Sequence, residues 1–371
     1  MSDKSQISFR VILYFIFAAV ILSVFILYIF LSRPVEYVDR DIDGVTMGTI
    51  YSVRVHNFPK RADWGKFAIG IQDRLDQIEQ KMSLFKSDSD ISRFNISKSL
   101  DWFPVSSATA EVVFLSVSLS SNYGGVFDIT SAPLVSLWGF GVERRRRSID
   151  EIRNEVAKVK DKIGSDKLAV RLDPPAIKKS ISELQIDLSA VAKGYAVDVI
   201  SRYCEDFGLA DYMIDVGGEI CCMGGKGKDK DWRVGVELPV IIPRGEWGGI
   251  YQVMVIGNQC MATSGGNRNF KVIDGKYYSH LIDPRTCLPC QLGDEDDLAT
   301  GEWLGAVSVL DKSCARADAL ATAFFVLGAT DGLKVANERG VPVLFLVRKG
   351  NEIKEIASDS FYKSAKKIKS R

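Results

Sequence analysis

Residues 187–198, Asp-Leu-Ser-Ala-Val-Ala-Lys-Gly-Tyr-Ala-Val-Asp, run from the end of an expected strand into an expected helix. The helix covers 190–204, where apolar side chains recur at helical spacing. Its apolar stripe consists of Val191, Tyr195, Val199 and Ile200. A strand that leads directly into an amphipathic helix indicates a mixed fold of strands and helices.

The same two patterns continue on both sides of this stretch. Further helices are expected at 67–82, 109–122, 149–162, 315–327 and 331–339. Short runs rich in Val and Ile and bounded by Gly, Asp or Pro are typical of strands. They occur at 51–55, 212–216, 232–238, 250–257, 268–273, 305–310 and 342–347. The sequence therefore predicts an α+β protein with a mixed, largely antiparallel sheet core and flanking helices.

Composition is that of an ordinary globular protein, with 371 residues, 46% apolar and 26% charged. No break rich in Pro, Gly or Ser divides 44–361, so we expect one large domain there. The formal net charge of +1 gives no electrostatic case for a nucleic-acid partner.

An uncharged run of 22 residues, Val11 to Ser32, precedes this domain. As a helix it would span roughly 30 Å, the thickness of the hydrocarbon core of a membrane. A cleaved signal peptide would have a shorter apolar region followed by small residues. We therefore expect a single transmembrane helix at 11–32, between a short tail (1–10) and a linker (33–43). The flanking charges are nearly balanced and lean slightly towards an N-terminus inside.

The chain ends in a basic tail at 362–371 and contains seven scattered cysteines. This number and spacing do not indicate a dense disulfide framework. Cys287 and Cys290 form a CxxC, which is weak evidence for zinc without a second pair. A disulfide, a redox pair and two ordinary thiols all remain open for these two residues.

The start of the helix at 190–204 also has the features of a ligand site. Asp187 and Ser189 stand where N-cap residues stand. A helix start offers free backbone N–H groups to an anion, and Lys193 is close enough to reach a bound phosphate. Simple capping and a solvated lysine are the structural alternatives.

Asp318 and Thr322 lie four residues apart within Ala315-Arg-Ala-Asp-Ala-Leu-Ala-Thr-Ala-Phe325, so they share one helix face. The neighbours are mostly apolar, and a buried carboxylate without a partner is costly. A hard cation such as Mg²⁺ takes oxygen ligands of this kind. By itself the pattern favours an Asp paired with a nearby Arg and a Thr bonded to its own helix backbone.

Two glycine pairs and one histidine complete the candidate segments. The glycines are in Asp215-Val-Gly-Gly-Glu219 and Ala262-Thr-Ser-Gly-Gly266, and they permit close approach to a ring or a diphosphate. They also make plain turns. His280, in Tyr278-Ser-His-Leu-Ile-Asp-Pro-Arg285, is a candidate general base, because an unperturbed imidazole titrates near neutral pH.

These four segments follow a series of shorter motifs in the first half of the chain. The series is Met47-Gly-Thr49, Met82-Ser-Leu-Phe85, Ser92-Arg-Phe-Asn95, Phe127-Asp-Ile-Thr130, Pro133-Leu134 and Leu137-Trp-Gly-Phe-Gly141. In this order the whole set resembles the ApbE family, the FAD:protein FMN transferases. The resemblance covers almost the whole region after 44 and implies an ApbE or T-fold-like domain.

The resemblance also implies roles for the matching positions. The flavin and adenine sites would be lined by Met47, Phe85, Trp138, Gly139 and Phe140. Other contacts to FAD would come from Asp187, Lys193, Gly217, Gly218, Thr263 and Ser264. Mg²⁺ would be held by Asp318, Thr322 and the backbone carbonyls of Ala190 and Ala321. His280 and Asp283 would lie beside the reacting phosphate.

The implied reaction transfers the FMN moiety of FAD to a Thr or Ser hydroxyl of an acceptor protein, with Mg²⁺, and releases AMP. The implied acceptor is a subunit of a membrane redox pump, which places the catalytic domain in the periplasm of a bacterial inner membrane. An FAD pyrophosphatase and a flavin-binding protein without turnover are the alternatives. Cys287 stands where relatives often have Gly, and Phe85 stands where some have Tyr.

Overall fold

The structure is a computed structural model that describes residues 14–24, 36–142, 147–227, 231–241 and 248–368. The chain divides into two compact units. The smaller consists of 1–38 and 57–63, and within it the Lys60 ammonium pairs with the Glu36 carboxylate at 2.7 Å. The larger consists of 39–56 and 64–371 and contains every predicted site residue.

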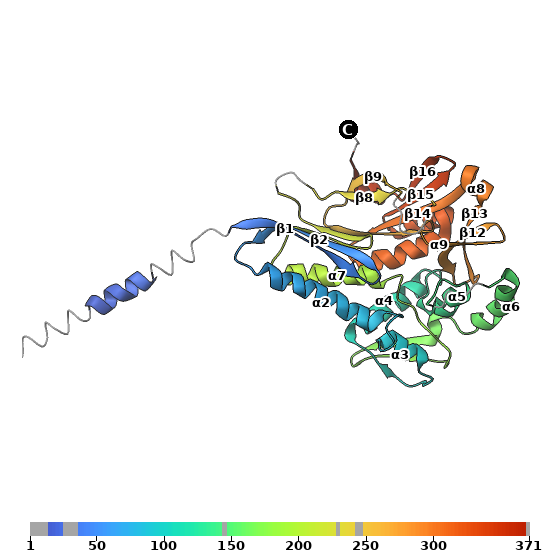
Figure 1. The fold of residues 1–371 in the computed structure, drawn as a ribbon, viewed down its shortest axis with the longest axis horizontal. Coiled ribbons are helices and arrows are strands. Elements are labelled where there is room, and N and C mark those ends of the chain that lie inside the picture. The colour runs from blue at the N-terminus through green and yellow to red at the C-terminus, as the bar shows by residue number, and fades with distance from the viewer. Residues whose placement is uncertain (1–13, 25–35, 143–146, 228–230, 242–247, 369–371) are drawn as a thin grey trace, which may run out of the picture. The chain divides into compact units, whose positions relative to one another are not determined.

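An eight-stranded sheet has the strand order β1-β2-β6-β7-β10-β14-β15-β16 (Figure 1). The strands are β1 Tyr37–Thr46, β2 Thr49–Pro59, β6 Tyr212–Val216, β7 Glu219–Met223, β10 Gln259–Gly265, β14 Glu302–Asp311, β15 Val343–Lys349 and β16 Glu352–Ala357. Each pair from β2 and β6 through β15 and β16 is antiparallel. The predicted α+β class with a largely antiparallel core is therefore confirmed.

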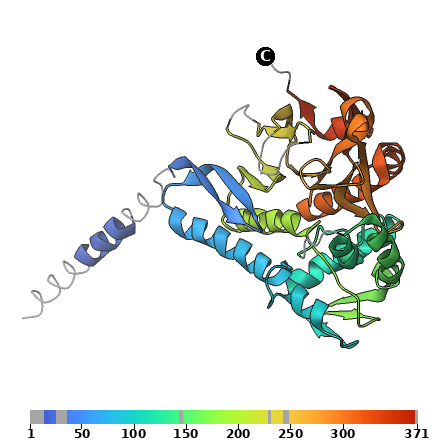
Figure 2. The ribbon, with the colours of Figure 1, turned by 45° about the vertical axis from the view of Figure 1, so that its right-hand side comes forward.

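Helices α7 (Ala192–Asp206) and α9 (Cys314–Arg339) pack against one face of this sheet and against each other (Figure 2). Helix α2 (Trp64–Met82) packs on α7. It buries the predicted apolar stripe, which consists of Phe67, Ile71, Leu75, Ile78 and Met82. This arrangement brings the starts of α7 and α9 together, and both carry predicted site residues.

Small sheets and short helices complete the larger unit. β17 (Lys366–Lys367), β9 (Ile250–Val255) and β8 (Val234–Glu237) form a sheet whose apolar side chains pack with those of β7, β10, β14 and β15. Two other sheets consist of β11 (Phe270–Ile273), β12 (Lys276–Asp283) and β13 (Leu288–Asp294), and of β3 (Phe103–Pro104), β5 (Pro175–Lys179) and β4 (Leu168–Leu172). The remaining helices are α3 Asp90–Ile96, α4 Ser107–Asn122, α5 Ala132–Leu137, α6 Ile149–Lys160, α8 Glu295–Thr300 and α10 Phe361–Ser364, with 3-10 turns at Ile129–Ser131 and Ser165–Lys167.

The expected break within the last long helix is present. Gly328 has φ 75° and ψ 171°, which is not helical, and it separates the two halves of α9. Glycine adopts positive φ without steric cost, so the chain can turn there and continue as a helix.

The expected strand end before residue 190 is wrong. Strand β5 ends at Lys179, and a loop leads to α7, which begins at Ala192. Asp187 does not cap that helix. The Asp187 Oδ1 accepts two hydrogen bonds from Ser189, one from its N–H at 2.8 Å and one from its side-chain hydroxyl at 2.5 Å. A local turn of this kind competes with regular structure, because a short polar side chain satisfies nearby backbone groups.

The expected linker and basic tail both contain regular structure. Strand β1 begins at Tyr37, within the expected linker at 33–43. Asp43 pairs with Arg54 at 3.0 Å, and Asp39 pairs with His56 at 2.6 Å. The alternating acidic residues Asp39, Asp41 and Asp43 therefore belong to strand β1, which pairs with β2. In the tail, Lys366 and Lys367 pair with β9 as β17.

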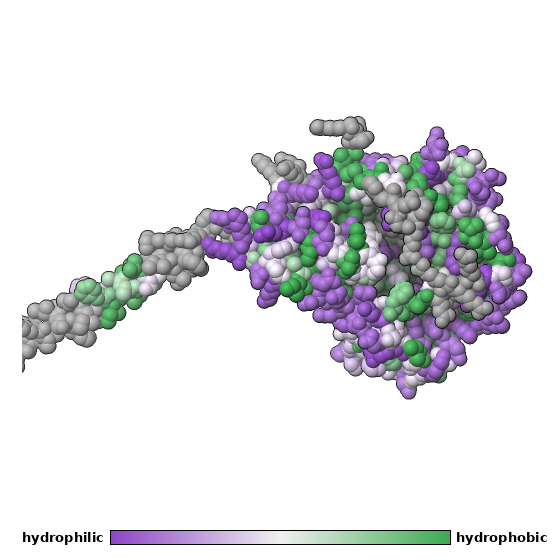
Figure 3. Space-filling model, viewed as in Figure 1, coloured by the Kyte–Doolittle hydropathy of each residue, from purple (hydrophilic) through white to green (hydrophobic). Residues whose placement is uncertain are grey.

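Half of the expected transmembrane segment 11–32 lies outside the described residues. Its described part, Tyr14–Val24, is an apolar helix with exposed side chains (Figure 3, green). Among the described residues, the one helix that is long and apolar enough to cross a membrane is Cys314–Arg339. That helix is α9, which packs on the sheet.

Candidate active site

The starts of α7 and α9 meet at Asp318. This side chain is 4% exposed, and its Oδ2 accepts a hydrogen bond from the N–H of Gly194 at 3.0 Å. A Cβ on Gly194 would lie 2.4 Å from the carbonyl oxygen of Cys314. Glycine is therefore required for the two helices to approach so closely.

Asp198 fixes the start of α9, although the sequence alone did not single out this residue. Its carboxylate accepts hydrogen bonds from the N–H groups of Cys314 at 2.7 Å and Ala315 at 3.1 Å, and from the Ser313 hydroxyl at 2.7 Å. A carboxylate at a helix N-terminus satisfies free N–H groups and is favoured by the dipole. Asp198 thus holds α9, and with it Asp318, against α7.

Lys193 forms an ion pair with Glu219, the first residue of β7. Glu219 is 3% exposed, and its Oε2 has no hydrogen-bond partner within the described part of the chain. Burial and the Asp318 carboxylate raise the pKa of Glu219 to about 8, although Lys193 opposes the shift. Burial alone would lower the pKa of Lys193, but Glu219 and Asp318 raise it above its ordinary value. One ammonium therefore balances two buried carboxylates.

Removing this ammonium should destabilise the fold. Lys193→Met leaves two buried carboxylates without their cation, and breaking a buried ion pair typically costs about 3 kcal/mol. Lys193→Met with Glu219→Leu should recover part of that stability in urea unfolding, because Asp318 still lacks its cation. The exposed pair Lys158–Glu155 supplies the control, since Lys158→Met should leave the midpoint unchanged. If the double variant is no more stable than Lys193→Met, the ion pair is not the cause.

Side-chain hydroxyls of β10 lie next to hydroxyls of α9 and of β14. The hydroxyls of Ser264 and Thr322 are 3.1 Å apart, and those of Thr263 and Ser308 are 2.8 Å apart. Asp318 lies one helical turn before Thr322. The described residues contain no cluster of three or more His, Cys, Asp or Glu side chains suited to a metal.

This donor set fits Mg²⁺ that is bound together with substrate phosphates. Such sites use one or two carboxylates and leave the remaining positions to waters and phosphate oxygens. Asp318 and Thr322 provide hard oxygen ligands. Ala190 lies just before α7, and Ala321 lies between Asp318 and Thr322, so both could add backbone carbonyls. A cation bound there would also favour ionisation of the buried Glu219, whose Oε2 has no hydrogen-bond partner among the described residues.

His280 lies on β12 beside Phe140, with ring centroids 6.4 Å apart. Its Nδ1 lies 3.1 Å from the carbonyl oxygen of Asn269, so an Nδ1–H donates there and leaves Nε2 as an acceptor. Burial lowers the pKa of His280 to about 4, and Lys193 contributes to the shift. The imidazole is therefore neutral at pH 7. Because the charge of Lys193 acts on His280, β12 lies within electrostatic range of the start of α7.

Trp138 is held by the turn that follows β12. Its Nε1–H donates to the carbonyl oxygen of Cys287 at 3.0 Å, and its ring lies 5.8 Å from that of Tyr278. Gly139 follows with φ 74°. The segment with Trp138, Gly139 and Phe140 therefore meets the segment with His280.

Asp283 is engaged in the same turn. Its carboxylate accepts hydrogen bonds from the Arg285 side chain, at 2.8 Å from Nη2, and from the Arg285 N–H at 2.9 Å. These contacts are those of a residue that shapes a turn. A role beside the reacting phosphate stays a prediction for Asp283.

Cys287 has φ 61°, a conformation that favours glycine. Its side chain is fully buried beside Leu134 and Trp138. A positive φ costs a non-glycine residue about 1 kcal/mol or more.

This backbone conformation predicts an order of stability for two variants. Cys287→Gly and Cys287→Ala both lose the sulfur atom, but only glycine relieves the strain. The glycine variant should therefore be about 1 kcal/mol more stable than the alanine variant in urea unfolding. An alanine variant of equal or greater stability would contradict this account.

Met47 and the glycine pair of β6 and β7 lie close together. Met47 and Gly48 form the turn between β1 and β2, with φ values of 48° and 71°. The N–H of Gly217 donates to the carbonyl oxygen of Ile50 at 3.0 Å. Gly217 and Gly218 are exposed and have positive φ, so each adopts a conformation that suits glycine. Glu219 follows them directly. The glycine pair in the sequence did not indicate that this acidic residue pairs with Lys193.

Phe85 is 75% exposed at the end of α2, and its N–H donates to the Ser83 hydroxyl at 3.1 Å. An exposed aromatic ring on an ordered turn is available to stack on a flat ligand. Its place in a flavin or adenine site stays a prediction.

A disulfide joins Cys221 of β7 to Cys260 of β10, which face each other in the sheet register. Cys287 and Cys290, the CxxC pair, are free thiols. Of the alternatives open for this pair, the structure therefore excludes a disulfide between them. Residues 39 positions apart become neighbours only through strand pairing, which Cys spacing does not reveal.

The chain matches the model of the ApbE family over residues 47–345. An FAD:protein FMN transferase of Vibrio cholerae serotype O1 is 36% identical over 332 residues, 89% of this chain and 93% of that protein. Its counterpart in Escherichia coli K12 is 32% identical over 86% of this chain and 87% of that protein. The structure of the flavin transferase ApbE from Vibrio cholerae matches with a TM-score of 0.74 and 34% identity, over 89% of this chain and all of that one. The apo flavinyl transferase ApbE of Pseudomonas stutzeri matches with a TM-score of 0.74 and 29% identity.

Proposed function

The chain belongs to the ApbE family and is a transferase, and we propose that it moves the FMN moiety of FAD to a Thr or Ser hydroxyl of an acceptor protein. The reaction needs Mg²⁺, forms a phosphoester and releases AMP. The observation that carries the proposal is the meeting of Gly194 and Asp318 at 3.0 Å, beside the ion pair of Lys193 and Glu219. It puts an acidic cation ligand and a phosphate-binding cation at one helix start.

Most of the site residues would bind Mg²⁺ or FAD, and His280 would transfer the proton. Asp318, Thr322 and the carbonyl groups of Ala190 and Ala321 would hold Mg²⁺. When bound, the ion would offset the charge of the diphosphate and of the AMP leaving group. Lys193 donates only part of its three N–H groups to Glu219 and can give the others to the phosphates.

The flavin side of FAD would rest on Met47, Phe85 and the segment Trp138-Gly-Phe140. Asp187, Gly217, Gly218, Thr263 and Ser264 would make the remaining contacts to FAD.

His280 would remove the proton of the attacking hydroxyl. The Asn269 carbonyl fixes the tautomer, so Nε2 is free to accept a proton. The hydroxyl oxygen bonds to the FMN phosphorus, the proton moves to Nε2, and the bond from phosphorus to AMP breaks. Most of the rate enhancement then comes from positioning and electrostatics. Asp283 contributes by ordering the turn after His280.

We place the enzyme in a bacterial inner membrane, with a single helix at 11–32 and the catalytic domain in the periplasm. Two observations support this location. The helix Tyr14–Val24 exposes apolar side chains along its length, and the Cys221–Cys260 disulfide is of the kind that persists in oxidising compartments. A periplasmic acceptor, such as a subunit of a membrane redox pump, fits this location. A phosphatase fused to the C-terminus should be active in the periplasm, and inactivity would overturn the orientation.

One assay tests the reaction. The purified protein is incubated with FAD, Mg²⁺ and an acceptor protein, and flavin fluorescence in a denaturing gel is measured together with AMP. Labelled acceptor with equimolar AMP is expected. AMP without labelling would indicate an FAD pyrophosphatase, and the absence of both products would indicate flavin binding alone.

A further inference from the structure

Helix α3 connects two parts of the site that are far apart in sequence. Asn95, in the last turn of α3, donates from Nδ2 to the carbonyl oxygen of Ile186 at 2.9 Å and accepts from the N–H of Ile186 at 2.8 Å. The amide therefore satisfies both backbone groups of one residue in the loop before α7. A side-chain amide can do this because it has the donor and acceptor pair of a peptide group.

A second contact from a neighbouring strand holds the same loop. Lys179 is 1% exposed, and its ammonium donates to the carbonyl oxygens of Phe94 at 3.0 Å and Leu184 at 3.2 Å. It also lies 4.7 Å from the centre of the Phe94 ring. Both contacts bind α3 to the loop directly before Asp187.

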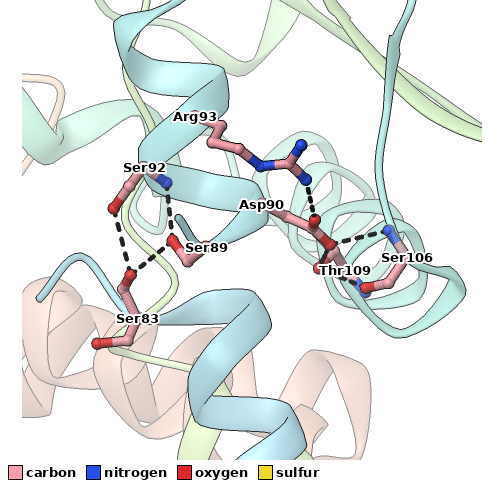
Figure 4. A network of polar contacts seen from close by, with 7 residues as sticks. All are labelled: Ser83, Ser89, Asp90, Ser92, Arg93, Ser106 and Thr109. Carbon is pink, nitrogen blue, oxygen red and sulfur yellow. Dashed lines mark hydrogen bonds and ion pairs between the residues drawn. The ribbon is translucent and has the colours of Figure 1, made fainter. Parts of the chain in front are cut away.

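The other end of α3 is fixed just as firmly (Figure 4). The Asp90 carboxylate accepts hydrogen bonds from the Ser106 N–H at 2.8 Å, the Thr109 hydroxyl at 2.9 Å and the Arg93 side chain at 2.8 Å. Ser89, the N-cap of α3, donates from its hydroxyl to the carbonyl oxygen of Ser83 at 2.7 Å. The hydroxyl of Ser83 accepts the hydrogen bond from Phe85.

We propose that Asn95 is a positioning residue for the FAD and Mg²⁺ site. It fixes Ile186, and the next four residues supply Asp187 and the carbonyl of Ala190. Because Ser89 ties the other end of α3 to the turn of Phe85, α3 sets the spacing between that turn and the loop at 187–190. This inference rests on the proposed function for the roles of Asp187, Ala190 and Phe85. Asn95 itself touches neither substrate nor reacting atoms.

The test compares Asn95→Ala with Asn337→Ala. Asn337 is a matched control, since its side-chain oxygen accepts a hydrogen bond from the N–H of Asp359 at 2.9 Å, far along the chain from the site loop. The FAD dissociation constant is measured by flavin fluorescence with Mg²⁺ and without acceptor. Asn95→Ala should raise it about tenfold, because the binding-competent loop is less populated. Asn337→Ala should leave it unchanged at a similar loss of melting temperature.

Asn95→Asp keeps the acceptor for the Ile186 N–H and loses the donor, so its effect should be intermediate. If Asn95→Ala does not fold, the FAD affinity of Asn95→Asp tests the inference. The Mg²⁺ concentration for half-maximal FAD binding should rise in the same order. Wild-type FAD and Mg²⁺ affinity in a folded Asn95 variant would overturn the inference. A wild-type protein that binds FAD but labels no acceptor would refute the proposed function and leave the role of Asn95 standing.

Discussion

Asp318→Asn should reduce FMN transfer by about 10³-fold, the scale seen when one preorganised electrostatic contact is removed from an active site. The amide oxygen of asparagine can still accept the hydrogen bond from the Gly194 N–H, so the contact between α7 and α9 is kept. The negative charge that would bind Mg²⁺ is lost. In-gel flavin fluorescence at fixed FAD and Mg²⁺ measures the effect.

The stability of this variant shows whether a loss of activity comes from the missing metal ligand or from a loss of folded protein. Burial raises the pKa of Asp318, although Lys193 and the Gly194 N–H oppose the shift. Removing the carboxylate should therefore leave the melting temperature near that of the wild type. Asp331→Asn makes the same change at an exposed position of α9 and should keep full activity. Asp318→Asn with wild-type transfer would refute the metal role.

His280→Gln should reduce transfer by about 10²–10⁴-fold, the usual contribution of a general base. Glutamine retains a polar side chain on β12 but cannot accept a proton near neutral pH. The FAD dissociation constant should change little, because the loss concerns proton transfer and not binding. Single-turnover labelling at saturating FAD measures the rate. A fall in FAD affinity with an unchanged rate would assign His280 to binding instead.

The pH dependence follows from the lowered pKa of His280. The folded value of about 4 lies below the ordinary value of 6.5, so the folded protein binds the proton less tightly than the unfolded chain. The neutral ring thus contributes stability above pH 6.5, and this contribution is lost as the pH falls from 6.5 towards 4. The wild type should lose more stability over that range than His280→Gln. The wild-type transfer rate should not fall near pH 6.5 through protonation of His280.

Local pattern alone predicted helices α2, α7 and α9 and several strands of the sheet, but not β10 or β12, which carry Ser264 and His280. The apolar stripe of α2 and the apolar strands β6 and β14 follow from side-chain periodicity, because burial on one face imposes a period of 3.6 or 2. The separation of Asp318 and Thr322 by one helical turn followed in the same way. The break at Gly328 was also visible, because glycine permits a non-helical residue between two helices.

Polar or very short segments were not visible in the same way. Strand β10 contains Ala262-Thr-Ser-Gly265 and lacks the apolar alternation of a typical strand, yet pairing with β7 and β14 makes it a central strand. The loop before α7 resembled a strand end, but Asn95 supplies the pairing that a neighbouring strand would provide. In both cases the partner is distant in sequence, so periodicity carries no signal.

The sequence by itself determined the α+β class, the order of motifs that resembles the ApbE family, and the candidate residues Lys193, His280 and Asp318. Tertiary structure decided which charges face each other. It paired Lys193 with Glu219, capped α9 with Asp198, joined Cys221 to Cys260 and lowered the pKa of His280. The reason is physical: hydrophobic periodicity is a local property, whereas the partner and the desolvation of a buried polar group depend on chain segments that meet only after folding.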